Sequence, residues 1–316
     1  MDILFITDSL SQFKIYKDTT YAIMAEVARR SYVLYTCEPR HLAYTGGSVE
    51  ARVQRFSIVG DYTNLGQWYN LEHSENRSLS TFSAVLMRKD PPFDMEYITS
   101  TWLLEIAERQ GARVFNKPRA IRDHSEKIAI SEFAQFAAPT LVTCDTARLR
   151  AFHSEYRDVI FKPLDGMGGR GIFRIREDYM NLGSTIEMLS SNGSRNVMAQ
   201  QYIPEIKDGD KRILLIGGKP VPYSLARIPQ GTEIRGNIAA GGVGYGQLLG
   251  LRDLEIAAAL GPVLADRGLL LVGLDVIGYW LTEINVTSPT CFREITKQTG
   301  FDIAAIFVNA LEHEIS

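Results

Sequence analysis

The chain has 316 residues, 45% of them hydrophobic, which is enough to bury a large core and to form two or three domains. Its formal net charge of −3 gives no general attraction to nucleic acid, and no uncharged apolar run approaches the length of a membrane span. The acidic Asp2 and Asp8 argue against a signal peptide, and three widely spaced cysteines match neither a disulfide framework nor a zinc site. We therefore expect a cytoplasmic protein that binds neither nucleic acid nor membrane.

The first 120 residues alternate between strand and helix patterns. One helix begins with Asp18 or Thr19 as its cap, and Asp94 caps a second helix that ends before Gly111. A strand–helix–strand opening is typical of a parallel sheet covered by helices, so we predict one α/β parallel-sheet domain over residues 1–120. The predicted elements are strands at 3–7, 32–36, 49–59 and 82–88 and helices at 17–30 and 95–110.

The rest of the chain divides into two smaller modules. Residues 121–203 combine helices, short strands and a glycine-rich hairpin, which predicts an α+β module. Residues 204–316 begin with a hairpin at 212–228, continue with a helix at 253–266 and two strands around Gly278, and end with a terminal helix.

The glycine-rich stretch "FKPLDGMGGRGIFRI", residues 161–175, places Gly166, Gly168 and Gly171 in the spacing G-x-G-x-x-G. In a dinucleotide site a helix follows these glycines at once, so that its N-terminus meets the pyrophosphate. Here the branched and aromatic "IFRIRE" follows, which predicts a second strand and excludes that site. The hairpin could lay backbone amides on phosphate, or it could be a plain surface hairpin.

The stretch "LLLVGLDVIGYWLTEINVTSPT" predicts two strands joined at Gly278. A two-residue loop would place Asp275 opposite Thr282, whereas a three-residue loop pairs Val276 with Thr282 and places Asp275 opposite Glu283. Only the three-residue loop leaves one face apolar, so it is favoured. The other face then carries Asp275, Glu283 and Asn285, whose hard oxygens suit Mg²⁺. The alternative is a solvated polar face, but two neighbouring acids without a cation would repel each other.

Positively charged side chains form a third pattern. Lys127 lies on the predicted helix at 124–133, and Lys162 lies inside the apolar strand "VIFKPL", where an ammonium group suggests an anionic partner. No Walker A motif is present, so a nucleotide site would need separated lysines, a glycine hairpin and a metal face. Four arginines at strand ends or in loops could hold carboxylates or phosphate, although each alone is typical of a protein surface: Arg88, Arg212, Arg227 and Arg235.

With these blocks in place, the chain resembles the bacterial glutathione synthetases of the ATP-grasp superfamily. The resemblance covers nearly the whole length, through "RKDPPFD", "FNKP", "KPLDGMGG", "IKDGDKR", "LARIPQG", "RGNIAAGG" and "LTEINVTSPT". It implies an ATP-grasp fold with an N-terminal α/β domain at 1–120, a small lid subdomain at 121–203 and a C-terminal subdomain at 204–316. The implied reaction joins γ-glutamylcysteine and glycine with ATP and Mg²⁺, for which Mn²⁺ can substitute, through an acyl phosphate. A homo-oligomer is also implied.

The resemblance assigns roles residue by residue. The ATP-binding set is Lys127, Lys162, Asp165, Gly166, Gly168, Gly169, Gln200, Gln201, Tyr202, Ile203 and Asp210, with the two lysines on the phosphates, residues 200–203 on adenine and Asp210 on ribose. The metal ligands are Asp275, Glu283 and Asn285. The substrate-binding set is Arg88, Arg212, Arg227, Ser288, Pro289 and Thr290, and the catalytic set is Arg212, Arg227 and Arg235.

The segment 227–247 holds Arg235 among six glycines, and the resemblance makes it a mobile lid that excludes water from the site. The chain departs from the family pattern at Val243 and Arg170, both in predicted loops. Two alternatives remain: another ATP-grasp carboxylate–amine ligase, which should lack the "LARIPQG" and "RGNIAAGG" blocks, and a non-catalytic ATP-binding regulator. The intact metal set and the substrate arginines argue against the regulator.

Overall fold

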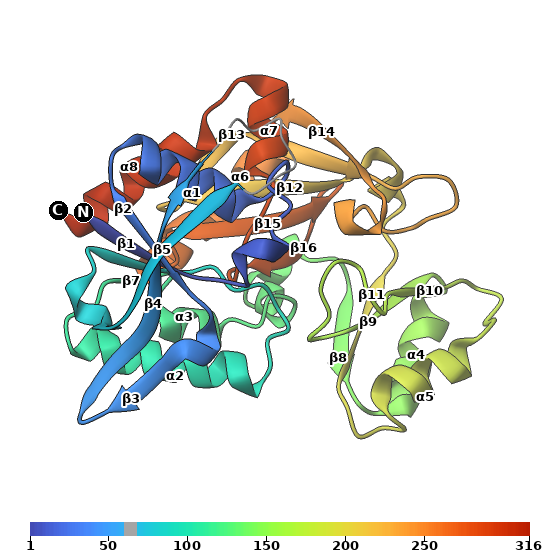
Figure 1. The fold of residues 1–316 in the computed structure, drawn as a ribbon. Coiled ribbons are helices and arrows are strands. Elements are labelled where there is room, and N and C mark those ends of the chain that lie inside the picture. The colour runs from blue at the N-terminus through green and yellow to red at the C-terminus, as the bar shows by residue number, and fades with distance from the viewer. Residues whose placement is uncertain (60–67) are drawn as a thin grey trace.

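The computed structural model describes residues 1–59 and 68–316, and within them the strands form three sheets. A seven-stranded sheet belongs to the N-terminal third, a four-stranded sheet to the middle of the chain, and a five-stranded sheet to the C-terminal part. Figure 1 shows the four-stranded sheet and its helices standing apart from the rest of the molecule. Among the helices that the structure describes, none combines the length and apolar character required to cross a membrane.

The N-terminal sheet is parallel only in its centre. Four strands run parallel in the order β2-β1-β6-β7, and an antiparallel ribbon joins them through β4, which pairs with β2. The parallel-sheet prediction is thus correct for the centre and wrong for the ribbon, where alternating burial along β4 is typical of a strand buried on one face. The strands are β1 (Asp2–Ile6), β2 (Val33–Cys37), β3 (Leu42–Thr45), β4 (Ser48–Ile58), β5 (Tyr69–Ser78), β6 (Ala84–Met87) and β7 (Val114–Phe115).

The helices of this part begin where the sequence predicts. α1 (Thr19–Arg29) has Asp18 as its N-cap, and the Asp18 side chain accepts a hydrogen bond from the Tyr21 amide. α2 (Met95–Arg109) is capped in the same way by Asp94, and the short α3 (Pro118–Asp123) follows β7. A side-chain oxygen at this position satisfies an amide that the helix itself leaves without a partner, so both caps are confirmed.

The small subdomain is an antiparallel sheet in the order β10-β9-β11-β8, and Figure 1 shows its two helices, α4 and α5, on the side away from the N-terminal sheet. β9 pairs with β10 in the predicted glycine hairpin, which confirms that a strand and not a helix follows the glycines. The elements are β8 (Thr140–Thr143), α4 (Thr146–Tyr156), β9 (Val159–Pro163), β10 (Phe173–Ile175), α5 (Leu182–Ser190) and β11 (Val197–Gln201).

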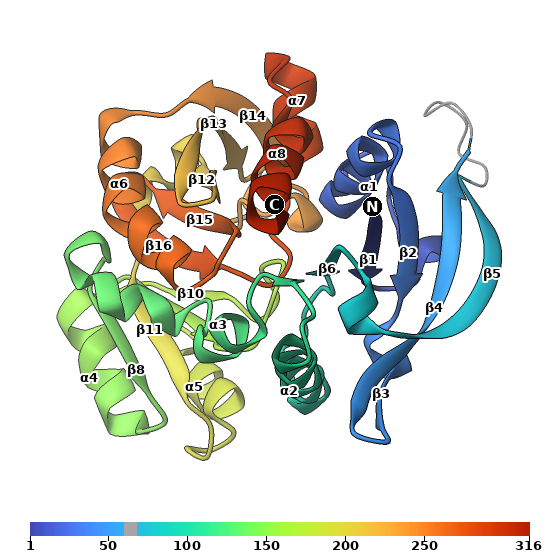
Figure 2. The same cartoon turned by 90° about the vertical axis from the view of Figure 1, so that its left-hand side faces the viewer.

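The C-terminal sheet is antiparallel in the order β14-β13-β12-β15-β16. The predicted terminal helix is two helices, because Gly300 adopts a left-handed conformation (φ +74°) that ends α7. Figure 2 shows α8 beside α1, so the C-terminal helix packs against the N-terminal domain. The elements are β12 (Asp210–Ile216), β13 (Lys219–Ile228), β14 (Val243–Leu248), α6 (Leu251–Asp266), β15 (Leu271–Ile277), β16 (Trp280–Asn285), α7 (Phe292–Thr299) and α8 (Ile303–Ile315).

The segment 227–247, predicted to be one mobile loop, contains a strand. Its last residues form β14 along the edge of the C-terminal sheet, so only 229–242 connects the strands as a loop. Backbone pairing needs no large side chains, and the glycines even favour it here, because a Cβ on Gly244 would lie 2.9 Å from Leu225. Composition alone could not reveal this strand.

Candidate active site

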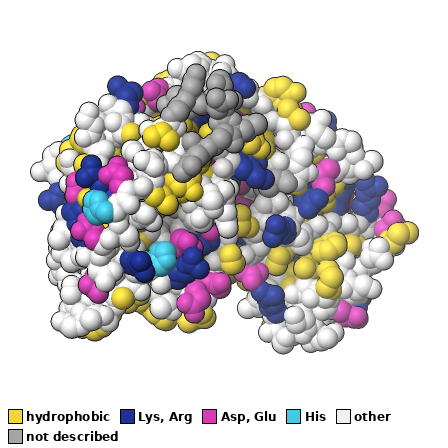
Figure 3. Space-filling view, in the orientation of Figure 1, with side chains coloured by type: hydrophobic (Ala, Val, Ile, Leu, Met, Phe, Trp, Pro, Cys, Tyr) yellow, Lys and Arg dark blue, Asp and Glu magenta, His cyan; other side chains and the backbone are white. Residues whose placement is uncertain are grey.

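A cavity lies between the small subdomain and the C-terminal sheet. Figure 3 shows the small subdomain separated from the N-terminal part of the molecule by a notch at the lower edge. Most residues predicted to bind ATP meet in the cavity, although they come from distant parts of the chain. The lining includes Lys127, Lys162, Gly166, Gly168, Gly169, Gln200, Gln201, Tyr202, Ile203, Asp210, Arg235, Asp275 and Glu283.

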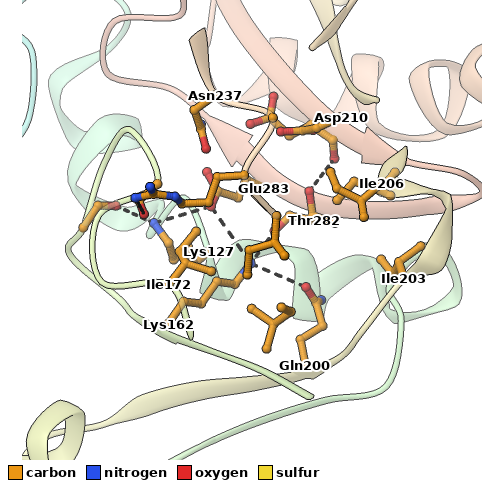
Figure 4. Close-up of a pocket in the computed structure, with 18 of the residues that line it drawn as sticks. Lys127, Lys162, Ile172, Gln200, Ile203, Ile206, Asp210, Asn237, Thr282 and Glu283 are labelled. Carbon is orange, nitrogen blue, oxygen red and sulfur yellow. Dashed lines mark hydrogen bonds and ion pairs between the residues drawn. The ribbon is translucent and has the colours of Figure 1, made fainter. Parts of the chain in front are cut away.

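Two buried lysines converge on one carboxylate in this cavity. Glu283 Oε1 lies 3.5 Å from Lys127 Nζ and 4.0 Å from Lys162 Nζ, and Figure 4 shows both ammonium groups turned toward it. Burial lowers the pKa of Lys162, while Glu283 opposes this shift. Lys127 is the N-cap of a 3₁₀ helix (Ile128–Phe136) and not an interior helix residue. A single carboxylate facing two cations leaves positive charge, which suits an anionic ligand.

The glycine hairpin covers one side of the cavity. Gly168 and Gly169 have φ of +62° and +80°, which is the left-handed region that favours glycine. Arg235 Nη1 donates to the Gly169 carbonyl at 3.2 Å, and a Cβ on Gly169 would lie 2.9 Å from Arg235 Cδ. The hairpin and the 229–242 loop therefore touch at a position where only glycine fits. The structure does not bring Asp165 to the cavity, because this residue is exposed and pairs with Arg195.

The segment predicted to bind adenine, residues 200–203, here called the hinge, comprises the last two residues of β11 and the two that follow, and it lines another wall of the cavity. The amides of Gln201 and Tyr202 donate to the carbonyls of Pro139 and Asp158, at 3.0 and 2.9 Å. In the described part of the chain, the Ile203 amide has no such partner, and it is the hinge amide left for a ligand. Gln200 turns its side chain to Lys162 Nζ at 3.4 Å.

Asp210 is buried at the start of β12. Its Oδ2 accepts a hydrogen bond from Arg227 Nη2 at 2.5 Å, whereas its Oδ1 is buried and has no hydrogen-bond partner among the described residues. Burial raises the pKa of Asp210, and Arg227 opposes this shift. Buried polar atoms are rarely left without a partner, so a ligand hydroxyl donating to Oδ1 would complete this position.

The β15–β16 hairpin brings the predicted metal ligands together by an unexpected route. Ile277 pairs with Trp280, so the loop has two residues and the predicted three-residue loop is wrong. A register shift, or β-bulge, between Asp275 and Val276 then restores the predicted pairing of Asp275 with Glu283 and of Leu274 with Ile284. Val276 consequently pairs with Leu281 and not with Thr282.

These acids already have cationic neighbours. Arg212 holds Asp275 with two hydrogen bonds of 2.5 and 3.0 Å, and Arg227 lies 3.0 Å from the same carboxylate. Burial alone would raise the pKa of Asp275, but these guanidinium groups hold it well below its usual range. Repulsion between Asp275 and Glu283 therefore gives no reason to expect a metal ion.

The case for a metal site at this hairpin rests on the chemistry of its donors. Among the described residues, no group of three or more His, Cys, Asp and Glu side chains is placed to hold a metal ion, and the predicted set has only two such residues. Its third member, Asn285, donates through its amide nitrogen to the Gly273 carbonyl at 3.2 Å, which leaves the amide oxygen for a cation. Two carboxylates and an amide oxygen from paired strands fit Mg²⁺.

A second cavity continues from the first past Gly166, Gly168 and Glu283. It is lined by most of the residues predicted to bind substrate, namely Arg212, Arg227, Ser288, Pro289 and Thr290, together with Asn285. Arg88 lines a third cavity and donates to the Pro289 carbonyl at 2.9 Å, so it borders the substrate side without lining the second cavity.

Sequence reasoning missed Glu126, which also lines the second cavity. One of its oxygens, Oε1, accepts hydrogen bonds from the amides of Val286 and Thr287 and from the Thr287 hydroxyl, at 2.9, 3.1 and 2.9 Å. Glu126 therefore ties the segment that carries Lys127 to the segment after β16. Its place beside Lys127 was the one local signal, and its partners lie 160 residues away in the chain.

Comparison with known proteins agrees with this geometry. Residues 1–122 match the family model of the prokaryotic glutathione synthetase N-terminal domain, and residues 126–300 match that of the prokaryotic glutathione synthetase ATP-grasp domain. The chain is 65% identical over 312 residues to glutathione synthetase of Ralstonia nicotianae, covering 99% of this chain and 95% of that protein. It is 54% identical to glutathione synthetase of Neisseria meningitidis serogroup B, covering 98% of each.

Solved structures show the fold. A D-cycloserine synthetase superposes with a TM-score of 0.68 at 16% identity, over 99% of this chain and 100% of that one. An ATP-grasp ligase complexed with a minimal precursor, Mg and ADP superposes with a TM-score of 0.62 at 16% identity, over 99% and 98% of the chains. The chain therefore has the ATP-grasp fold and belongs to the prokaryotic glutathione synthetase family.

Proposed function

We propose that this chain is a glutathione synthetase, an ATP-dependent ligase that joins γ-glutamylcysteine to glycine and releases ADP and phosphate. ATP phosphorylates the cysteinyl carboxylate, and the glycine amine then attacks the acyl phosphate and displaces phosphate. The observation that carries the proposal is the continuity of two cavities at Glu283, where one holds the buried lysines and the other the buried arginines. A phosphate donor and a carboxylate acceptor can meet at that junction.

ATP occupies the first cavity in this proposal. Lys127 and Lys162 bind its phosphates together with Gly166, Gly168 and Gly169 of the hairpin, since both lysines are buried and face a single carboxylate. The hinge residues Gln200 to Ile203 hold adenine. The Ile203 amide supports this assignment, because it has no backbone partner in the described part of the chain and would be left to donate a hydrogen bond to adenine. Asp210 accepts a hydrogen bond from a ribose hydroxyl, which would supply the missing partner of its buried Oδ1.

A divalent metal ion is the second cofactor. Asp275, Glu283 and Asn285 would hold Mg²⁺, which, when bound, neutralises phosphate charge during transfer. Arg212 and Arg227 orient the Asp275 carboxylate in either case, because both contact it directly. Asp165 has no supporting geometry in this structure and remains only a prediction of the family resemblance.

The substrate side uses arginines and no protein nucleophile. Arg212 and Arg227 border the second cavity with Ser288, Pro289 and Thr290, where they can hold the reacting carboxylate and the phosphate passing to it. Arg235 reaches the hairpin from the 229–242 loop and would bring a further guanidinium over the site. Positioning and charge neutralisation are enough for phosphoryl transfer.

Several finer predictions accompany this proposal. Mn²⁺ would replace Mg²⁺, because the donors are hard oxygens that both ions accept. We propose domains at 1–120, 121–203 and 204–316, a division supported by the presence of one sheet in each range; the first range includes residues 60–67, which lie outside the described residues. A homo-oligomer and a cytoplasmic location are inferred from the family.

A direct assay tests the function. Purified protein should release phosphate from ATP with Mg²⁺ only when γ-glutamylcysteine is present, and glutathione should form when glycine is added. D-Alanine pairs and a glutamate acceptor serve as controls for other ATP-grasp ligases. Equal turnover with either control, or phosphate release that ignores γ-glutamylcysteine, would contradict the assignment.

A further inference from the structure

Arg174, a residue of the glycine hairpin, contacts the hinge from outside the first cavity. It lies on β10, where it pairs with Ile160 of β9, and Ile160 in turn pairs with Gln200 of β11. Directly paired residues point to the same face of a sheet, so Arg174 stands on the face that carries Ile160 and Gln200. Those two residues line the cavity, whereas Arg174 is not among its lining residues. Arg174 therefore acts on the protein wall and not on the nucleotide itself.

Two contacts join Arg174 to the hinge. Its Nε and Nη2 donate to the two carboxylate oxygens of Asp158 at 2.9 and 2.7 Å, and the Asp158 carbonyl accepts the Tyr202 amide at 2.9 Å. Arg174 Cζ also lies 3.4 Å from the centre of the Tyr202 ring, well inside the range of about 6 Å for an attractive cation–π contact. Arg174 thus holds Tyr202 both by its ring and through the backbone of Asp158.

The backbone that presents Asp158 is strained. Arg157, the residue before it, has φ +62° and ψ −31°, and the Asp158 amide donates to the Tyr156 carbonyl at 2.7 Å. This is the γ-turn with positive φ, which residues with a side chain rarely adopt. Strained backbone persists only where surrounding contacts hold it. The Arg174 ion pair supplies such a contact, so we expect Asp158 and the Tyr202 amide to move together when it is removed.

The position of Tyr202 decides which hinge amide faces the cavity. The Gln201 and Tyr202 amides are used within the protein, so among the described residues the Ile203 amide is the hinge donor left for a base. A fixed amide donor distinguishes purines. N1 of adenine accepts a hydrogen bond, whereas N1 of hypoxanthine carries a hydrogen and would leave the amide without a partner. If the Tyr202 amide were also released, the hinge would no longer present a single donor at a fixed place.

We propose that Arg174 is a positioning residue for adenine recognition: by fixing Asp158 and Tyr202, it presents the Ile203 amide to N1 of the base. The inference rests on the proposed function, specifically on ATP occupying the first cavity. It makes the second strand of the glycine hairpin, whose loop covers the phosphate side, a determinant of base selectivity as well. The planar guanidinium suits this role, because it can form two parallel bonds and stack on a ring at the same time.

Nucleotide binding to the full-length enzyme tests the assignment. Isothermal titration calorimetry with ATP and with inosine triphosphate, in the presence of Mg²⁺ and without γ-glutamylcysteine, gives a Kd for each nucleotide. The wild-type enzyme should bind ATP about 10- to 100-fold more tightly, as expected when a buried amide loses its acceptor. Because no acceptor substrate is present, an enzyme that fails to use γ-glutamylcysteine would refute the proposed reaction and leave this measurement valid.

Matched variants isolate the Arg174 contacts. Arg174→Met should weaken ATP binding about tenfold and inosine triphosphate binding less than about twofold, and Arg174→Lys should be intermediate. Adding Arg174→Met to Asp158→Asn should have little further effect, because both changes break the same pair. Arg176→Met, which alters an exposed arginine two residues further on, should change neither Kd. In steady-state kinetics the Arg174→Met effect should fall on KM for ATP and much less on kcat.

Three outcomes would overturn the proposal. The first is equal binding of the two nucleotides by the wild-type enzyme, because the hinge amide would then not read the base. The second is an Arg174→Met variant that keeps the wild-type preference for ATP. The third is an equal loss of affinity for both nucleotides in that variant together with a lower melting temperature, which would show that Arg174 has only a structural role.

Discussion

Glu126 offers the sharpest test of how the site is held together. Replacing it with alanine removes an acceptor of three hydrogen bonds, two of them from backbone amides that follow β16. Replacing it with glutamine keeps an oxygen at the same place and removes only the charge. The backbone bond from the Ile284 amide to the Glu126 carbonyl, 2.9 Å long, is unaffected by either change.

The expected loss in the free energy of unfolding depends on which hydrogen-bond donors each variant leaves without an acceptor. Val286 and Thr287 are 0% and 5% exposed, so in Glu126→Ala their two amides lose a partner in a place that water reaches poorly. Each buried donor without a partner costs about 1–3 kcal/mol, which gives a loss of about 2–6 kcal/mol in the free energy of unfolding. Glu126→Gln weakens three bonds by about 1 kcal/mol each, but it also removes a buried charge, so its net cost should be about 1 kcal/mol or less.

The pH dependence of the free energy of unfolding provides an independent test of the Glu126 argument. Burial is the largest influence on the pKa of Glu126 and raises it above the ordinary value of 4.5. The protonated group therefore favours the folded state, and its contribution to stability is lost as pH rises through the folded-state pKa. Glu126→Gln does not titrate, so its stability relative to wild type should improve as pH rises above about 4.5.

Urea unfolding and steady-state kinetics measure these effects together. Glu126→Ala should unfold at clearly lower urea than Glu126→Gln and should lose far more kcat, because the segment with Asn285 is no longer fixed. Equal stability of the two variants would refute the hydrogen-bond argument. A glutamine variant as inactive as the alanine variant would show that the charge itself is needed in the reaction.

Three further predictions concern the metal, the lid and the hairpin. Glu283→Gln should lose most phosphate release and keep its fold, and near-normal turnover at limiting Mg²⁺ would remove Glu283 from the metal site. Trypsin should cut the free enzyme at Arg235, and ATP with γ-glutamylcysteine should protect this site from cleavage. Arg235→Ala should lower kcat more than it lowers ATP affinity. Unchanged cleavage with both ligands bound, together with normal turnover of the alanine variant, would show that the loop is only a linker. Gly169→Ala should lower kcat/KM at least about tenfold, because the added Cβ would collide with Arg235. Gly300→Ala is the control: Gly300 has a similar φ, but nothing lies within 4 Å of an added Cβ, so this variant should lose stability only. Equal kinetics for the two variants would contradict the contact between the hairpin and the 229–242 loop.

Local signals in the sequence predicted local structure well. Asp18 and Asp94 cap helices because a cap depends on four consecutive residues, and the hairpin of β9 and β10 depends on glycines between two short apolar runs. The same reasoning found Lys162, because an ammonium group in an apolar strand stands out without knowledge of its neighbours.

Features that depend on distant pairing were missed. The β-bulge opposite Asp275 cannot be read from a pattern of alternating residues, since two loop lengths fit that pattern and the bulge reconciles them. The ribbon of β4 and β5 makes the first sheet mixed. β4 alternates in burial, but β5 is polar and largely exposed, so its sequence carries no strand pattern. The role of Glu126 likewise depends on a partner 160 residues away.

The charge balance of the site shows most clearly what long-range pairing adds. Sequence reasoning placed Asp275 by its hairpin partner Glu283, but β12 lies on the other side of β15 and sets Arg212 directly opposite Asp275. The acid that suggested an unneutralised metal face is thus already neutralised, while Glu283 is shared by Lys127 and Lys162. The positive charge left over belongs to the lysines, on the side of the cavity beneath the glycine hairpin. A polyanionic nucleotide is therefore attracted to the lysine side by the protein alone, and a metal ion bound beside Glu283 would add to that attraction instead of creating it.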